Sequence, residues 1–179
     1  ALYGQVGALN TEQTKSIQEA VGGFYSNNPL QRFRPAFSEK KFVDYLAAHG
    51  HAEVSSVVSV QPSGLSKATL TLKAREPIAS WTIAGTQYYV DKSGVVFKTN
   101  FYAAPSIRIV DNSGTVPQQG VVASNQLLQF IGKATGNMKA YGFMISEIDL
   151  PPNTTREAIF VLTTGEQVKM TIDRPAGEQ

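Results

Sequence analysis

One stretch decides the fold of the first part of the chain: Lys67-Ala68-Thr69-Leu70-Thr71-Leu72-Lys73-Ala74-Arg75. Apolar and polar side chains alternate along it, and a period of two indicates a β-strand with one buried and one wet face. The preceding run Val54–Val60 is β-branched and half apolar. Between the two runs, Gln61-Pro62-Ser63-Gly64 has the composition of a type I turn. The sequence therefore predicts a β-hairpin over residues 54–75.

Two helices and a short strand are expected before this hairpin. Residues 2–8 could form the strand, and Asn10 or Thr11 can cap the first helix. Gly22-Gly23 should end or loosen that helix, and residues 25–37 should form a loop. The buried face of the helix is predicted from i, i+3, i+4, i+7 spacing as Ile17, Ala20, Val21 and Phe24.

The second helix has clear signals at both ends. Ser38 can cap its N-terminus, and Gly50 stands where a C′ glycine belongs. Its apolar stripe consists of Phe42, Tyr45 and Leu46. The order strand, helix, helix, strand, strand within residues 1–76 fits one small domain.

The rest of the chain has the pattern of a second, mostly antiparallel β domain with one helix, so the fold class is α+β. Short strands are expected at residues 78–83, 87–90, 95–98 and 106–110. A helix should begin after Ser124, bury Leu127, Leu128, Ile131 and Ala134, and close at Gly136. Residues 143–150, 158–163 and 167–173 then resemble an antiparallel meander.

The last of these strands has a regular alternation of side chains. Val168, Met170 and Ile172 are expected to face inward, and Lys169, Thr171 and Asp173 outward.

Composition and motifs exclude several kinds of chemistry. The net charge is +2 and the 179 residues include no cysteine, so neither a broad nucleic-acid-binding field nor a thiolate site is expected. His49-Gly50-His51 lacks further metal ligands, and both histidines should cap a helix end in solvent. Ser38 and Lys41 match a penicillin-binding motif without its companions, so Ser38 should serve as a helix cap. We expect no catalytic site, metal or cofactor.

Two short motifs carry a resemblance to a known family. Arg75-Glu76-Pro77-Ile78-Ala79-Ser80-Trp81 resembles the junction of FtsQ/DivIB cell-division proteins, and Tyr89-Val90-Asp91-Lys92-Ser93-Gly94-Val95-Val96-Phe97 is similar to a hairpin of the same family. Their order and spacing, after a helix–helix–hairpin unit, also match the family.

The resemblance implies a domain division and a function. Residues 1–76 would be a POTRA domain, residues 77–175 the family's β domain and residues 176–179 a tail. Such proteins are non-catalytic scaffolds of the divisome, held by one N-terminal transmembrane helix with this region outside the plasma membrane. They bind FtsB/DivIC-like and FtsL-like bitopic proteins during septum formation. The chain starts without methionine, which suggests an excised region of a longer protein.

The family's partner-binding residues cannot be transferred to this chain. Family members continue past the strand at residues 167–173, whereas this chain stops at Gln179, through trimming or natural shortening. A terminal strand can present unpaired backbone groups to a partner strand, unless later chain covers it. The candidate partner-binding residues are accordingly Gln167, Val168, Lys169, Met170, Thr171, Ile172 and Asp173.

Three alternatives stay open at this stage. The chain could instead be a POTRA-type polypeptide-binding module of a translocation or outer-membrane assembly system. Trp81 could anchor an interface, although a place in the seam between the two domains is preferred. Arg32-Phe33-Arg34 should cover the edge of the core, or meet a protein or a lipid head group.

Overall fold

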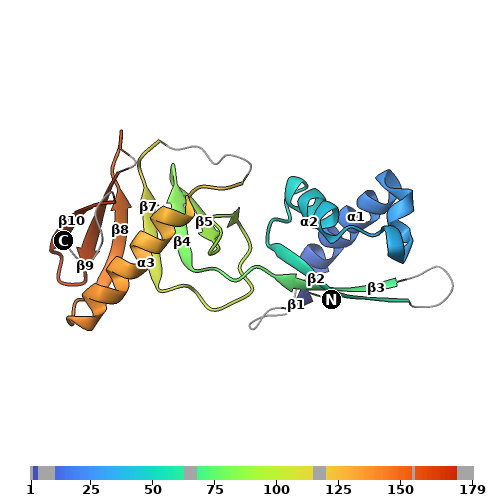
Figure 1. The fold of residues 1–179 in the computed structure, drawn as a ribbon, viewed down its shortest axis with the longest axis horizontal. Coiled ribbons are helices and arrows are strands. Elements are labelled where there is room, and N and C mark those ends of the chain that lie inside the picture. Colours follow the sequence, from blue (N-terminus) through green and yellow to red (C-terminus); the bar gives the residue numbers. More distant parts are fainter. Residues whose placement is uncertain (1, 4–10, 63–67, 115–119, 155, 173–179) are drawn as a thin grey trace. The chain divides into compact units, whose positions relative to one another are not determined.

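The computed structural model describes residues 2–3, 11–62, 68–114, 120–154 and 156–172. The chain forms two compact units. Unit 1 comprises Ala1–Glu76 together with Thr99–Ala103, and unit 2 comprises Pro77–Lys98 together with Ala104–Gln179. Each unit packs helix against sheet, so the expected α+β class is confirmed (Figure 1).

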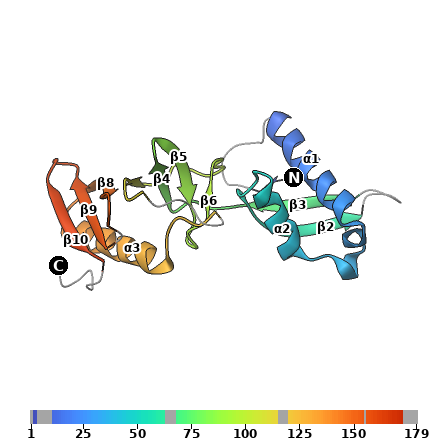
Figure 2. The same cartoon turned by 90° about the horizontal axis from the view of Figure 1, so that it is seen from above.

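Unit 1 has its helices on one face of a small sheet (Figures 1 and 2). Among the described residues the strand order is β1-β3-β2, with β1 parallel and β2 antiparallel to β3. The expected strand at residues 2–8 is described only at its first two positions. The elements are β1 (Leu2–Tyr3), α1 (Thr11–Asn27), η1 (Pro29–Arg32), η2 (Arg34–Ala36), α2 (Glu39–Ala48), β2 (Val54–Pro62) and β3 (Ala68–Ala74).

The core of unit 1 confirms the predicted faces of both helices and of the hairpin. Phe24 of α1 meets Phe42 of α2 edge to face, with ring centroids 5.0 Å apart. Such aromatic pairs stabilise a core beyond the area that they bury. The buried residues of this core are Ile17, Phe24, Phe42, Leu46, Val54 and Leu72.

Two expectations about glycine and proline in unit 1 are wrong. Helix α1 continues through Gly22-Gly23 to Asn27, because Phe24, which follows directly, is buried in the core; Gly23 lies close to Tyr45, where a Cβ would be 2.8 Å from the Tyr45 hydroxyl. The supposed loop at residues 25–37 is consequently the end of α1 followed by η1 and η2. Pro62 belongs to β2 and not to a turn, opposite Ala68.

Unit 2 is built on a mixed sheet. Within the described residues the strand order is β10-β9-β8-β7-β4-β5-β6, and α3 lies across one face (Figures 1 and 2). The pairs β4–β7 and β7–β8 are parallel and the other pairs are antiparallel. The elements are β4 (Ala79–Ile83), β5 (Thr86–Val90), β6 (Val96–Phe97), β7 (Ile107–Asp111), α3 (Asn125–Ala140), β8 (Ile145–Leu150), β9 (Glu157–Leu162) and β10 (Gln167–Thr171).

The core of unit 2 lies between α3 and the sheet. Ile131 and Ala134 of α3 are buried there with Ile109, Ile148 and Phe160 of the sheet. Ser124 caps α3 by accepting the N–H of Leu127, as predicted.

Two further expectations fail in unit 2. Helix α3 does not close at Gly136 but runs to Ala140, because Met138 extends its buried face by one more turn. The glycine that ends it is Gly142, with φ +85°. Trp81 is neither a surface anchor nor a seam residue: it is fully buried in the core of unit 2, and its Nε1–H donates to Asp111 Oδ2 at 3.0 Å.

Candidate interaction edge on β10

The last described strand lies at one end of the sheet of unit 2. Strand β10 pairs with β9, with Gln167 opposite Val161 and Thr171 opposite Glu157, and is the terminal strand in the order. The structure therefore places Gln167, Val168, Lys169, Met170 and Thr171 in an edge strand. Ile172 follows directly, and Asp173 lies outside the described residues.

Two hydrogen bonds determine which backbone groups of β10 face its open side. The N–H of Leu162 donates to the Glu166 carbonyl at 2.8 Å, and the N–H of Ile172 donates to the Arg156 carbonyl at 2.7 Å. Both pairs keep the register of the β9–β10 ladder. In an antiparallel ladder, hydrogen-bonded and non-hydrogen-bonded pairs alternate. Every second residue counted from Ile172, namely Met170 and then Val168, must therefore bond to β9.

The intervening residues have the opposite orientation. The backbone N–H and C=O groups of Gln167 and Lys169 point away from β9, along the border of the described sheet. Thr171 has the same parity, but it takes part in a further interaction. Gln167 and Lys169 thus define an outward-facing backbone ribbon of the kind that accepts a strand from another chain. We call this ribbon, residues 167–169, the β10 edge.

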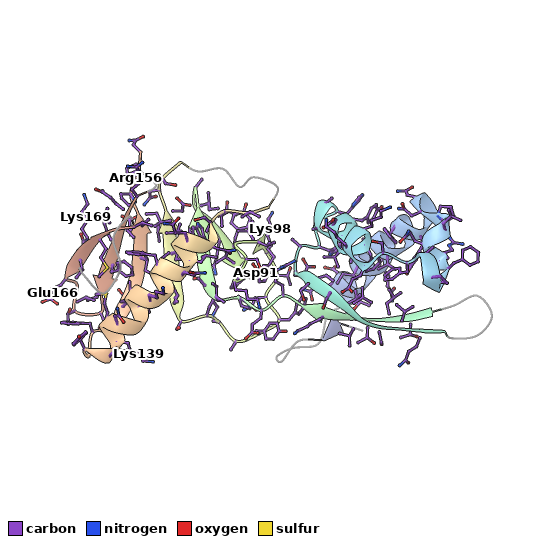
Figure 3. All side chains as sticks on the ribbon, in the orientation of Figure 1. Asp91, Lys98, Lys139, Arg156, Glu166 and Lys169 are labelled. Carbon is purple, nitrogen blue, oxygen red and sulfur yellow. The ribbon has the colours of Figure 1, made fainter. Side chains whose placement is uncertain are left out.

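The side chains of β10 confirm the predicted alternation. Met170 is buried in the core, and Val168 and Ile172 pack against it. Lys169 lies on the opposite face, where its Nζ is 2.8 Å from Glu157 Oε2 on β9. Figure 3 labels Lys169 among the side chains of unit 2. A cross-strand ion pair between solvent-accessible side chains contributes little stability. An added strand would meet an apolar row on one face and this pair on the other.

The other end of the same sheet is covered. Strand β6 is only two residues long, and both are buried. The N–H of Val96 donates to the Gly120 carbonyl at 2.8 Å, and the N–H of Val122 donates to the Gly94 carbonyl at 3.0 Å. Residues 120–122 therefore close the border that β6 would otherwise present.

The long edge of unit 1 is also partly closed. Strand β2 has two irregularities in its register with β3, and the N–H of Val57 donates to Glu39 Oε1 of α2 at 2.9 Å. Bulges and side chains that occupy edge groups are common devices against strand addition. Compared with β2, the β10 edge is the more available ribbon among the described residues.

A hollow of about 330 Å³ lies beside the end of β10. Asp111 on its wall is already engaged, because its carboxylate accepts the N–H of Trp81 and both the N–H and the hydroxyl of Ser113. The hollow is near the lower end of the size range of ligand pockets. Its wall includes Asp111, Leu127, Leu150, Arg156, Glu157 and Ile172.

A polar cluster in unit 1 escaped the sequence analysis. Ser16 Oγ lies 3.1 Å from His51 Nε2, and His51 Nδ1 lies 3.0 Å from Glu53 Oε1. The expectation that His51 lies in solvent is wrong, since it is only 8% exposed. His49 does cap α2, where its Nδ1 bonds to the Tyr45 carbonyl. Only the spacing of His51 and Glu53 could have hinted at the cluster, because Ser16 is distant in sequence.

This order of groups also occurs in nucleophilic enzymes, but its surroundings differ here. Ser16 lies within α1, where its backbone N–H belongs to the helix and cannot serve as an oxyanion donor. These two contacts join α1 to the residues that lead into β2. We therefore interpret Ser16, His51 and Glu53 as a structural hydrogen-bond network that holds α1 against the residues before β2.

No three histidine, aspartate and glutamate side chains of the described residues converge as metal ligands would. None of the described helices has the length and apolar character needed to span a bilayer.

Comparison with known proteins gives no family assignment. No family model matches the chain, and no curated protein matches it.

Proposed function

We propose that this chain is a non-catalytic scaffold that recruits another polypeptide to the β10 edge by strand addition. The observation that carries the proposal is the outward orientation of the Gln167 and Lys169 backbone groups, whereas residues 120–122 cover the β6 border at the opposite end of the described sheet. Backbone bonds to such an edge supply affinity, and alternate side chains supply selectivity.

The cellular role that we propose is the one implied by the resemblance to FtsQ/DivIB proteins. The chain would act in the divisome, on the extracytoplasmic side of the plasma membrane, held by a transmembrane helix outside this sequence. Its partners would be FtsB/DivIC-like and FtsL-like bitopic division proteins. Unit 1, with its order of strand, helix, helix, strand, strand, is consistent with a POTRA domain, and unit 2 with the family's β domain.

Two residues of the second shared motif, Asp91 and Gly94, have structural tasks that are consistent with the resemblance in fold. Asp91 Oδ1 accepts the N–H groups of Ser93 and Val95, which closes the turn between β5 and β6. Gly94 has φ +79°, and a Cβ there would lie 2.2 Å from the Ala123 carbonyl oxygen. A sequence that forms this hairpin thus needs aspartate and glycine at these positions for folding.

A translocation or outer-membrane assembly module is the second candidate. Such a module would be expected to use the long edge of unit 1 to hold polypeptides. That edge is interrupted by the Glu39 bond to Val57 and by two irregularities, which favours the β10 edge as the docking strand.

The test is a binding titration with the extracytoplasmic segment of the FtsB/DivIC-like protein encoded in the same genome. Lys169→Pro removes an outward N–H, whereas Lys169→Ala removes the same side chain and keeps that N–H. We expect Lys169→Pro to weaken binding at least about tenfold, and Lys169→Ala to change it about twofold or less. Equal affinities of the two folded variants would contradict strand addition. A wild-type chain that does not bind would contradict the choice of partner.

A further inference from the structure

We infer that the turn between α1 and α2 of unit 1 contacts the surface of a bilayer that contains anionic phospholipids. This inference goes beyond the role of β10 and does not depend on it. The turn consists of η1 and η2 at the end of the helix layer (Figures 1 and 2). We call it the η turn, residues 28–38.

Two large apolar side chains are exposed together on this turn. Leu30 is 70% exposed and Phe33 is 66% exposed. The N–H of Phe33 donates to the Leu30 carbonyl at 3.1 Å, which is the i to i+3 bond of a 3₁₀ turn. Phe33 is the C-cap of η1 and has an extended backbone, with φ −86° and ψ 123°. Leu30 and Phe33 are thus two exposed apolar side chains of one short turn, and we call this pair the apolar point. Phe33 does not cover the core edge as one of the sequence-based interpretations held.

Local hydrogen bonds hold the turn in this exposed form. The Asn28 side chain donates to the Phe24 carbonyl at 3.0 Å, and the N–H of Ser38 donates to Gln31 Oε1 at 2.6 Å. The N–H of Ala36 donates to the Phe33 carbonyl at 2.9 Å. Pro29 fixes the first position of η1. Because these hydrogen bonds fix the backbone at both ends of the turn, Leu30 and Phe33 are already exposed in the free protein.

The charges of the turn complement an anionic surface. Residues 20–38 include Arg32 and Arg34 and no aspartate or glutamate. The nearest carboxylates in the sequence are engaged elsewhere: Glu19 lies 3.9 Å from Lys15, and Glu39 accepts the Val57 N–H. The exposed side chain of Arg32, close in sequence to Leu30 and Phe33, suits contact with the anionic head groups of a bilayer.

The small size of the apolar point favours a bilayer over a protein as its occupant. Stable protein interfaces bury roughly 800 Å² on each partner, which two side chains cannot supply. A bilayer requires no matching surface, and a few inserted side chains with basic neighbours give weak, reversible binding. The η turn is therefore suited to weak, reversible contact with a lipid surface. Such contact can orient unit 1 at the membrane but is too weak to anchor it there.

Co-sedimentation with vesicles tests this inference. The intact chain is mixed with millimolar lipid as phosphatidylcholine vesicles, or as vesicles that also contain phosphatidylglycerol. We expect the wild type to bind the mixed vesicles, and Phe33→Ser or Leu30→Ser to lower the partition coefficient about tenfold. Arg32→Gln should lower it only for the anionic vesicles. The matched controls are Val58→Ser in unit 1 and Phe143→Ser in unit 2, whose side chains are 59% and 49% exposed.

A spectroscopic variant provides a second measurement. Phe33→Trp places an indole on the η turn, while the native Trp81 is buried in unit 2 and supplies a constant background. The difference spectrum should shift to shorter wavelength when anionic vesicles are added. Absence of wild-type binding, or an equal loss in the control variants, would overturn the inference. A Phe33→Ser variant that binds the anionic vesicles as well as the wild type would also overturn it.

Discussion

The sheet of unit 2 has two borders that are built in opposite ways. At β6 the chain returns to its own sheet, and Val96 and Val122 donate backbone bonds that close the border. At β10 the backbone N–H and C=O groups of Gln167 and Lys169 point away from β9, at the border of the described sheet. Because one sheet includes both solutions, the difference shows that this fold can cover an edge. Within the described residues, the β10 edge is therefore the border at which a partner strand could be added.

The largest expected effect is at the covered border. Gly94 and Gly114 share φ +79°, but only at Gly94 would a Cβ meet another atom, the Ala123 carbonyl oxygen. Gly94→Ala should destabilise unit 2 by about 4 kcal/mol through strain and overlap, and Gly114→Ala by about 1 kcal/mol through strain alone. Urea unfolding followed by Trp81 fluorescence reports unit 2. Equal losses would mean that the β6 border is not tightly closed.

The next effect compares inward and outward amides of β10. Val168→Pro should cost about 3 kcal/mol more than Val168→Ala, because it removes a bond to β9. The free energy of unfolding of Lys169→Pro should be lower than that of Lys169→Ala by less than about 1 kcal/mol, because the Lys169 N–H faces outward and bonds nothing on β9. The alanine variant at each position corrects for the lost side chain. Similar penalties at both positions in urea unfolding would refute the assigned alternation.

A smaller effect concerns the turn that leads into β6. The Asp91 carboxylate accepts two backbone N–H groups, at 2.8 and 3.0 Å. Asp91→Ala should destabilise unit 2 by about 2 kcal/mol, and Asp91→Asn by about 1 kcal/mol, because the amide oxygen can still accept. A stability unchanged by Asp91→Ala would show that the turn does not need this side chain.

The smallest effect concerns the segment that follows β6. Residues 99–103 belong to unit 1, where the Tyr102 hydroxyl donates to the Ala74 carbonyl at 3.1 Å. Tyr102→Phe should cost unit 1 about 1 kcal/mol at pH 7. Thermal unfolding followed by circular dichroism measures this change. A stability equal to that of the wild type would indicate that the bond contributes nothing.

The same residue gives a dependence on pH. Burial, and secondarily the negative charge of Glu76, raise the pKa of Tyr102 above its ordinary value. The folded state thus retains the phenol proton longer than the unfolded state, whose pKa is about 10. This contribution is complete below pH 10 and is lost as pH rises through the folded pKa. Between pH 7 and pH 11, Tyr102→Phe should lose less stability than the wild type. Burial of Tyr25 leaves part of the decline in both.

Local signals predicted much of the fold. The caps Ser38 and Ser124 and the alternation in β3 and β10 depend on near neighbours in the sequence, and the structure confirms them. The predicted helix ends at Gly22-Gly23 and at Gly136 are wrong, because burial of Phe24 and Met138 just beyond them outweighs the low helix propensity of glycine.

Other features depend on contacts between distant parts of the chain. The parallel pairing of β4 with β7 and of β7 with β8 cannot be recognised from the periodicity of the sequence. Ser16 and His51 are 35 residues apart and come together only in the folded chain. For the candidate site, the sequence indicated the strand and its inward face. It could not indicate which amides point outward, because this follows from the register with β9.

Hydrogen exchange of the β10 amides, followed by NMR in the free chain and in the complex with the partner segment, tests the central claim most directly. In the free chain we expect slow exchange at Val168 and Met170 and fast exchange at Gln167 and Lys169. In the complex, Lys169 should become protected at least about tenfold while Val168 changes little. A Lys169 amide that is already protected in the free chain, or that stays exposed in a saturated complex, would contradict docking at the β10 edge.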